Sequence, residues 1–175
     1  DGSAHTKKQY KVTYGTETIE GEEGQVEFKL STGDKVTVTP AESATITHVA
    51  QSTVDNAFTW TVENDSFYTK GTDTVGKLKI NPATLTIVTE SAEKEYDGTA
   101  LTADGSINGF VNNETATFKV TGSQTEVGKS NNTYTLTWDG TAAESDYKKS
   151  ETIGELEVKK STKELKVKSA DGEWT

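Results

Sequence analysis

The stretch GKLKINPATLTIVT, residues 76–89, decides the fold because it returns later in the chain as GELEVKKSTKELKV, residues 154–167. The matched residues are Leu78 with Leu156, Ile80 with Val158, Thr84 with Thr162 and Ile87 with Leu165. Apolar and polar residues alternate along both stretches, which is the period of a β-strand with one buried face. A repeat over this distance predicts a chain built from successive similar modules.

The repeat continues upstream of these stretches. NAFTWTV, which begins at Asn56, matches NTYTLTW, which begins at Asn132, and both keep their large residues in the same phase. We therefore divide the chain into a divergent first module (1–82), a second module (83–160) and a terminal stretch (161–175). The terminal stretch is interpreted as the first strand of a truncated next repeat or as a C-terminal extension. The junctions NPAT and KKST are short and poor in Gly and Ser, so we expect a stiff, elongated tandem.

Local signals point to strands and turns throughout. Gly-Asp and Asp-Gly pairs separate the alternating runs at short spacing. Leu85 and Ile87 are expected in the first strand of the second module, and Tyr96 is expected to plug the edge of its core. Residues 40–50 are the only place predicted to hold a short irregular or helical insertion. The fold class is all-β and antiparallel, with two tandem immunoglobulin-like sandwiches; β-grasp-like modules with a short helix are the alternative.

Composition excludes several classes of protein. The chain has 175 residues, a net charge of −10 and no cysteine, and all 18 of its positive side chains are lysines. Without cysteine there are no disulfides or thiolate metal sites. An acidic chain without arginine is unsuited to nucleic acid, whose phosphates attract basic patches. The sequence shows no signal peptide, membrane span or sorting tail. Its polar start, DGSAHTKK, and its end, DGEWT, lead us to expect a piece of a longer protein.

The second module, residues 83–160, resembles the YDG and MBG-type repeats that occur in tandem in large bacterial surface proteins. The resemblance rests on EYDGTALTADG, on NGFVNNETATFKVTGSQTEVG from Asn108, and on SDYKKSETIGELEV from Ser145. The first module is more divergent, with TYGTET at its start and the extra residues AESATITHV before FTWTV. The resemblance implies an exported adhesin-like protein of the bacterial cell surface or cell wall, anchored through regions outside this chain. It implies no catalytic residues.

No residue is identified as catalytic, cofactor-binding or metal-binding, and no enzyme activity or cofactor is expected. His5 and His48 lack the spacing of metal ligands. The acidic loops 104–114 and 139–146 do not follow a calcium-loop pattern and are interpreted as solvated turns. Trp60 and Trp138 lie in the apolar phase of their strands and are expected to pack in the core.

Lysine offers one further possibility, a spontaneous Lys–Asn isopeptide bond. Such a bond needs a buried lysine beside a carboxylate. Lys29, Lys79 and Lys119 lie within strand patterns, but each falls on the polar phase. The pattern therefore disfavours the bond.

Two functions follow from these observations. The first is a stiff stalk or spacer that projects a distal binding domain. The second is a binding module that itself contacts a host glycan, mucin or immunoglobulin, with the divergent residues 40–50 as its most suitable loop. We expect a monomer outside the cell, with a host glycan or glycoprotein as the partner class, no nucleic-acid partner and no insertion into the membrane.

Overall fold

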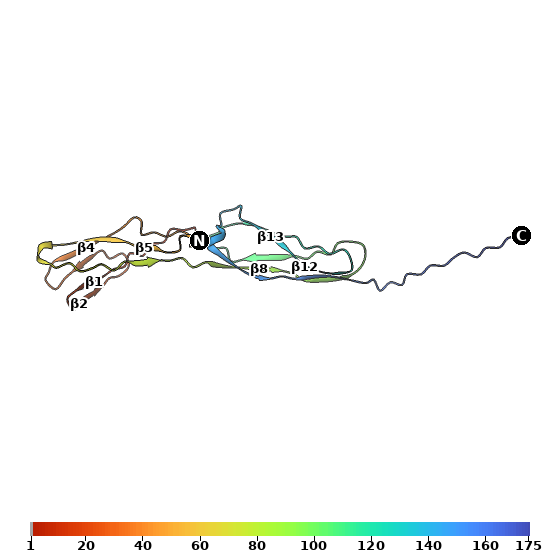
Figure 1. Cartoon of the computed structure of the whole chain (residues 1–175), viewed down its shortest axis with the longest axis horizontal. Coiled ribbons are helices and arrows are strands. Elements are labelled where there is room, and N and C mark those ends of the chain that lie inside the picture. Colours follow the sequence, from red (N-terminus) through yellow and green to blue (C-terminus); the bar gives the residue numbers. More distant parts are fainter. Residues whose placement is uncertain (1) are drawn as a thin grey trace. The chain divides into compact units, whose positions relative to one another are not determined.

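The computed structural model describes residues 2–175 and is all-β, which confirms the predicted class (Figure 1). The chain forms two compact units. The first unit holds the chain up to Ala83 together with Val111–Glu114 and Ala142–Lys148. The second unit holds Thr84–Phe110, Thr115–Thr141 and Lys149–Thr175. We describe each unit by itself.

The first unit contains three small antiparallel sheets. The central sheet has the order β3-β4-β6; the hairpin β1-β2 and the antiparallel pair β5-β7 form the other two. The strands are β1 (Lys11–Tyr14), β2 (Glu17–Glu20), β3 (Glu27–Lys29), β4 (Lys35–Pro40), β5 (Val54–Asn56), β6 (Phe58–Val62) and β7 (Gly76–Leu78). The predicted strand FTWTV is confirmed as β6.

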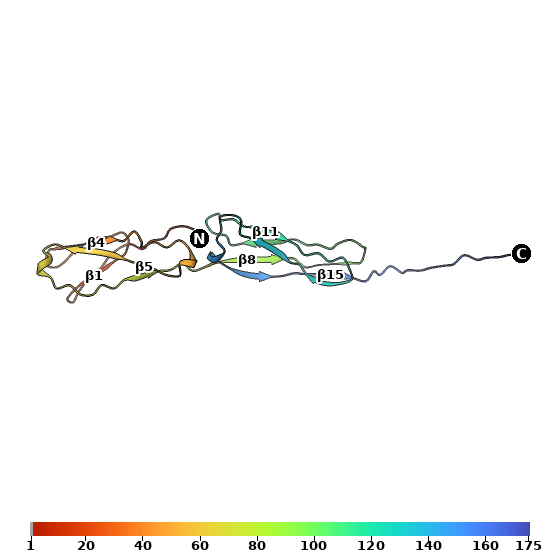
Figure 2. The same ribbon diagram turned by 45° about the horizontal axis from the view of Figure 1, so that its top comes forward.

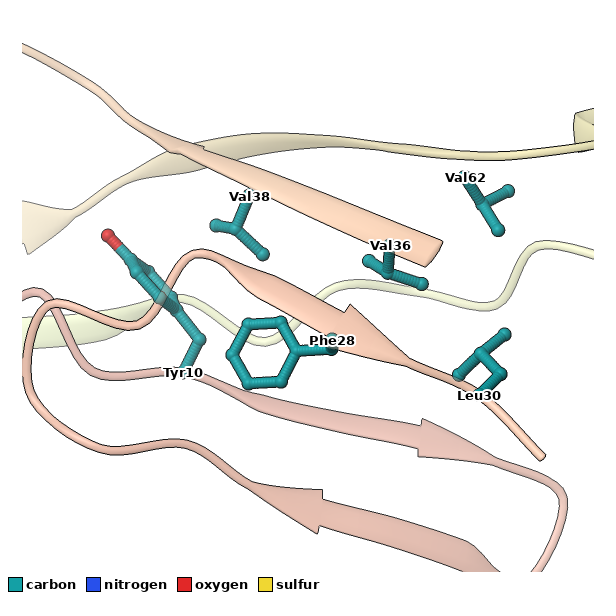
Figure 3. Packing of buried hydrophobic residues seen from close by; sticks show 6 residues of the cluster. All are labelled: Tyr10, Phe28, Leu30, Val36, Val38 and Val62. Carbon is teal, nitrogen blue, oxygen red and sulfur yellow. The ribbon is translucent and has the colours of Figure 1, made fainter. Parts of the chain in front are cut away.

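The core of the first unit lies on one face of the central sheet. Six buried side chains form it, namely Tyr10, Phe28, Leu30, Val36, Val38 and Val62. Figure 3 shows the ring of Phe28 beside Tyr10, with the Tyr10 hydroxyl pointing away from that ring. Val36 and Val38 are two residues apart on β4 and therefore share a face. Burying each such side chain stabilises the unit by about 1.5–3 kcal/mol.

The second unit also contains small sheets, with the orders β10-β8-β14, β11-β13 and β12-β15-β9. Its strands are β8 (Ala83–Thr89), β9 (Ala92–Glu95), β10 (Gly105–Asn108), β11 (Thr117–Val120), β12 (Gly128–Asn131), β13 (Tyr134–Thr137), β14 (Tyr147–Thr152) and β15 (Glu155–Lys159). Figure 2 labels β8, β11 and β15 in a turned view. The prediction of purely antiparallel strands is wrong at one place, because β9 and β15 pair in parallel. Alternation along a strand fixes its buried face but not the direction of its neighbour.

The buried face of the second unit agrees with the predicted alternation. Leu85, Ile87 and Leu156 are each 0% exposed, and the predicted first strand of the second module is confirmed as β8. Tyr96 is 47% exposed, so the prediction that it plugs the core is wrong. It follows the last residue of β9, where the chain turns at Asp97 and leaves no sheet face to bury the ring.

Three short 3-10 helices interrupt the strands of residues 2–175. They are η1 (Val49–Gln51), η2 (Asp65–Phe67) and η3 (Glu144–Asp146). The first begins in the predicted irregular region 40–50. The prediction that this was the only such place is wrong, because η2 and η3 each form a tight turn after a long strand run. Residues 161–175 contain no strand.

Candidate functional site

The first unit contains a groove of about 540 Å³ on the core side of its central sheet. Its floor is formed by side chains of β4 and β6, among them Val38, Phe58 and Trp60. Residues 9–14, which include β1, form one wall, and residues 68–74 form the other. The volume lies within the range of small ligand sites, about 300–1,000 Å³.

The wall formed by β1 presents a free strand edge. A two-residue turn folds β1 onto β2, and Gly15 takes the positive φ of 55° that the first position of a type II′ turn requires. The Gly21 amide donates to the Tyr10 carbonyl at 2.9 Å, so residues 10, 12 and 14 bond toward β2. The peptide groups of Lys11 and Thr13 therefore point away from β2. Among the described residues β2 is the only strand paired with β1.

The opposite wall continues into a segment that we call the strap, residues 69–75, which contains no strand. The Trp60 Nε1–H donates to Asp73 at 2.8 Å, and the Lys70 ammonium lies 5.3 Å from the centre of the Trp60 ring. Lys70 also pairs with Asp65 at 2.6 Å. These contacts hold the strap against the edge of β6 and leave the groove open between the strap and β1.

Tyr68, directly before the strap, fixes the end of the groove. Its hydroxyl donates to Asp34 at 2.6 Å, and its ring meets that of Tyr14 edge-on at 5.5 Å. The hydrogen bond to the Asp34 carboxylate raises the pKa of Tyr68 above its ordinary value.

Tyr10 brings a polar group to this apolar site. The residue is 9% exposed, and within residues 2–175 its hydroxyl has no hydrogen-bond partner. Burial, with a smaller contribution from the negative charge of Glu23, raises the pKa of Tyr10. The hydroxyl therefore remains a neutral donor. An unpaired buried hydroxyl costs the fold about 1–3 kcal/mol.

The divergent residues 40–50 are held by a contact that sequence reasoning missed. The Asp146 side chain is fully buried; its Oδ2 lies 2.7 Å from His48 Nδ1, and its Oδ1 accepts the Val49 amide at 2.7 Å. Burial alone would raise the pKa of Asp146, but the hydrogen bonds from His48 and Val49 outweigh it and lower that pKa. His48, interpreted as incidental, therefore anchors this loop. The two residues are 98 positions apart, and no local pattern connects them.

The other residues that the sequence singled out make contacts that hold the fold. His5 forms a bridge with Ile46. The Asp139 carboxylate accepts hydrogen bonds from the Thr117 amide and hydroxyl, at 3.1 Å and 2.9 Å, and so holds the end of β11. Within residues 2–175 no group of three or more His, Asp or Glu side chains is placed to hold a metal ion.

The lysines and tryptophans follow the predicted phases. Lys29, Lys79 and Lys119 are exposed, so none offers the buried amine that an isopeptide bond needs. Trp60 and Trp138 are half-buried. Trp60 packs against the core of the first unit, and Trp138 meets Phe110 edge-on at 6.4 Å.

Comparison with known proteins returned no match: no protein-family model, no curated protein and no solved structure is similar to this chain. In the part of the chain that the structure describes, no helix is long and apolar enough to cross a membrane.

Proposed function

We propose that this chain is a non-catalytic repeat segment of an adhesin-like protein of the bacterial surface, of the YDG and MBG type, and that it acts as a stalk or spacer. The observation that carries the proposal is the internal repeat. Stretches matched in sequence become β6 and β13, and β7 and β15, with the same alternation of inward and outward residues. A repeated module without a catalytic cluster is suited to setting distance.

The outward faces of the strands support the same role. They carry ion pairs between neighbouring strands, such as Lys129 with Glu155 at 2.8 Å and Lys159 with Glu93 at 2.7 Å. Exposed pairs of this kind add little stability but keep a surface hydrated and free of apolar patches. We propose an immunoglobulin-like sandwich for each module. The β-grasp alternative draws support from the parallel neighbours β9 and β15.

Small-angle X-ray scattering of the chain tests the spacer function. A stiff tandem gives a maximum dimension near the summed length of two modules and a well-defined cross-section. Inserting Gly-Ser-Gly-Ser between Asn81 and Pro82 should then broaden the distribution of distances, while the same insertion in the exposed tail, between Ala170 and Asp171, should not. A compact particle, or a broad distribution before any replacement, would overturn the proposal.

The second function, a binding module for a host glycan, mucin or immunoglobulin, is favoured by the groove of the first unit. Screening the chain against host glycans and glycoproteins tests it. Loss of any such binding in a variant with Trp60 replaced by Phe, which removes the indole donor but keeps an aromatic ring, would place the contact in the groove. Retention of binding in that variant would place it elsewhere.

A further inference from the structure

Two features of the chain complement each other. The first unit has a groove beside a strand edge that no strand covers. The tail, residues 161–168, has the alternating pattern of a strand but forms no strand itself. Thr162 donates hydrogen bonds to the Glu95 carboxylate at the end of β9, whereas farther along Leu165 is 92% exposed and Val167 is 95% exposed. One feature lacks a strand and the other lacks a sheet.

The second unit shows what the groove lacks. The strap of the first unit corresponds to β14 of the second. A short 3-10 turn precedes each, with a tyrosine next to that turn: Tyr68 comes directly before the strap and Tyr147 is the first residue of β14. Each segment also leads into the repeated Gly-x-Leu strand. In the second unit β14 lies beside β8. In the first unit no strand pairs with the strap, and the groove occupies one side of it. A strand of the β8 type is therefore the kind of ligand that fits.

The tail carries a strand of that type. In the repeat alignment Leu165 corresponds to Ile87 and Val167 to Thr89, two residues of β8 that are 0% and 2% exposed. Placing Leu165 and Val167 over an apolar floor would bury side chains that now face water, each burial contributing about 1.5–3 kcal/mol before the cost of ordering the tail.

Charge favours the same pairing. Residues 161–168 contain three lysines and one glutamate, whereas the whole chain has a net charge of −10. The lysines of the groove are already paired with carboxylates, Lys11 with Glu20 at 3.4 Å and Lys70 with Asp65 at 2.6 Å. A basic strand therefore approaches an acidic molecule without meeting uncompensated positive charge.

A strand fits the groove better than a sugar does. Sugar rings stack on open aromatic faces, but the Trp60 ring is covered by the Lys70 ammonium. The Tyr10 ring meets Phe58 edge-on at 5.7 Å, so it too presents no free platform. The free peptide groups of Lys11 and Thr13 instead need backbone donors and acceptors, which an extended peptide supplies.

We propose that the groove binds residues 161–168 of a second copy of this chain as a strand added to the free edge of β1. Leu165 and Val167 face the floor, and the peptide groups of Lys11 and Thr13 complete the ladder. This association goes beyond the spacer function. It also modifies the expectation of a monomer, because the chain would then be monomeric only at low concentration.

Sedimentation equilibrium of the 175-residue chain, from micromolar to millimolar, tests the proposal. Self-association is expected in the unmodified chain and should weaken at least tenfold in the Leu165→Asp, Val167→Asp double variant. The control Trp174→Asp changes an equally exposed apolar residue of the tail outside 161–168, and it should associate normally. Circular dichroism confirms that each variant remains folded.

A second pair of variants tests the acceptor edge. Thr13→Pro removes an amide that points toward the groove and should abolish association, whereas Thr18→Pro removes the amide of its partner on the opposite edge of the same hairpin and should not. A synthetic peptide of residues 161–169, added to the labelled double variant, should shift NMR signals of residues 9–14 and 68–74.

Three results would overturn the proposal. One is a chain that stays monomeric at millimolar concentration while the peptide shifts none of these signals. Another is association that all four variants share equally. The last is peptide binding that shifts signals of the second unit alone.

Discussion

Asn132 offers the sharpest test of how the second unit is held together. The residue is 0% exposed. Its amide Nδ2 donates to the carbonyls of Glu90 at 2.9 Å, Ala103 at 3.2 Å and Asp104 at 3.3 Å. One side chain therefore joins the end of β8 to the loop before β10. Asn132→Ala leaves these carbonyls without that donor, and Asn132→Asp replaces the donor by a carboxylate that faces them.

The loss of stability in Asn132→Ala can be estimated from these contacts. The Asp104 carbonyl keeps a partner, since it also accepts the Glu90 amide at 2.8 Å. The carbonyls of Glu90 and Ala103 then lose a hydrogen bond worth about 0.5–1.5 kcal/mol each, so Asn132→Ala should lower the free energy of unfolding by about 1–3 kcal/mol. Asn132→Asp should cost more at neutral pH. In acid the Asn132→Asp variant should regain part of this lost stability, because a protonated carboxyl can donate one hydrogen bond.

Urea unfolding at pH 4 and pH 7, followed by NMR signals of the second unit, measures both variants separately from the first unit. Asn56→Ala, followed by NMR signals of the first unit, is the matched control, because Asn56 occupies the same place in the repeat but donates to a single carbonyl, that of Lys7 at 2.8 Å. Asn56→Ala should lower the free energy of unfolding by about 1 kcal/mol or less. The reasoning is wrong if Asn132→Ala costs no more than this control, or if Asn132→Asp is as stable as Asn132→Ala at pH 7.

Three further predictions concern single side chains. Hydrogen bonds from Lys94 and from the Thr99 amide and hydroxyl lower the pKa of Asp97, so its contribution to stability is fully present above pH 3.8 and fades as the pH falls below that value. Asp97→Asn should therefore lower the urea midpoint more at pH 7 than at pH 2. Burial, and then the hydrogen bond to Glu151, raises the pKa of Tyr134 to about 12, so the free energy of unfolding should fall as pH rises from 10 to 12. Urea unfolding across this range should show a smaller fall for Tyr134→Phe than for the unmodified chain. Leu156 is 0% exposed, so Leu156→Ala should lower the free energy of unfolding, measured with urea, by about 2–5 kcal/mol. A decrease below about 1 kcal/mol would be incompatible with a tightly packed core.

Much of the fold could be predicted from the sequence because alternation is a local signal. The runs around Trp60 and Ile87 show which residues face inward, and the structure confirms both strands. The direction of the β9–β15 pair could not be predicted, since alternation is the same for parallel and antiparallel neighbours. Tyr96 was misplaced because its apolar character was weighed above the Asp-Gly turn that follows it.

The candidate site was harder to predict than the strands. Trp60 was correctly expected on the core face, but the groove beside it depends on the strap. The strap begins TKGTDT, which carries no apolar residue to bury, whereas the stretch before it and the strand after it do. The lack of apolar residues in this stretch indicates a segment that does not form a buried strand, and so an open groove between it and β1. The contact of His48 with Asp146 had no such signal, because it depends on the folded path of the chain between them.

The parallel pairing of β9 and β15 also affects how the second unit responds to mechanical load. The two strands lie in adjacent register from Ala92 with Leu156 to Glu95 with Lys159. They belong to the opening and closing runs of the unit, so tension applied at its two ends pulls them in opposite directions along their length. All their hydrogen bonds are then loaded in shear at once, whereas a hairpin pulled open from its ends loses its bonds one after another. The unit should therefore resist stretching to high force and yield abruptly when this ladder breaks.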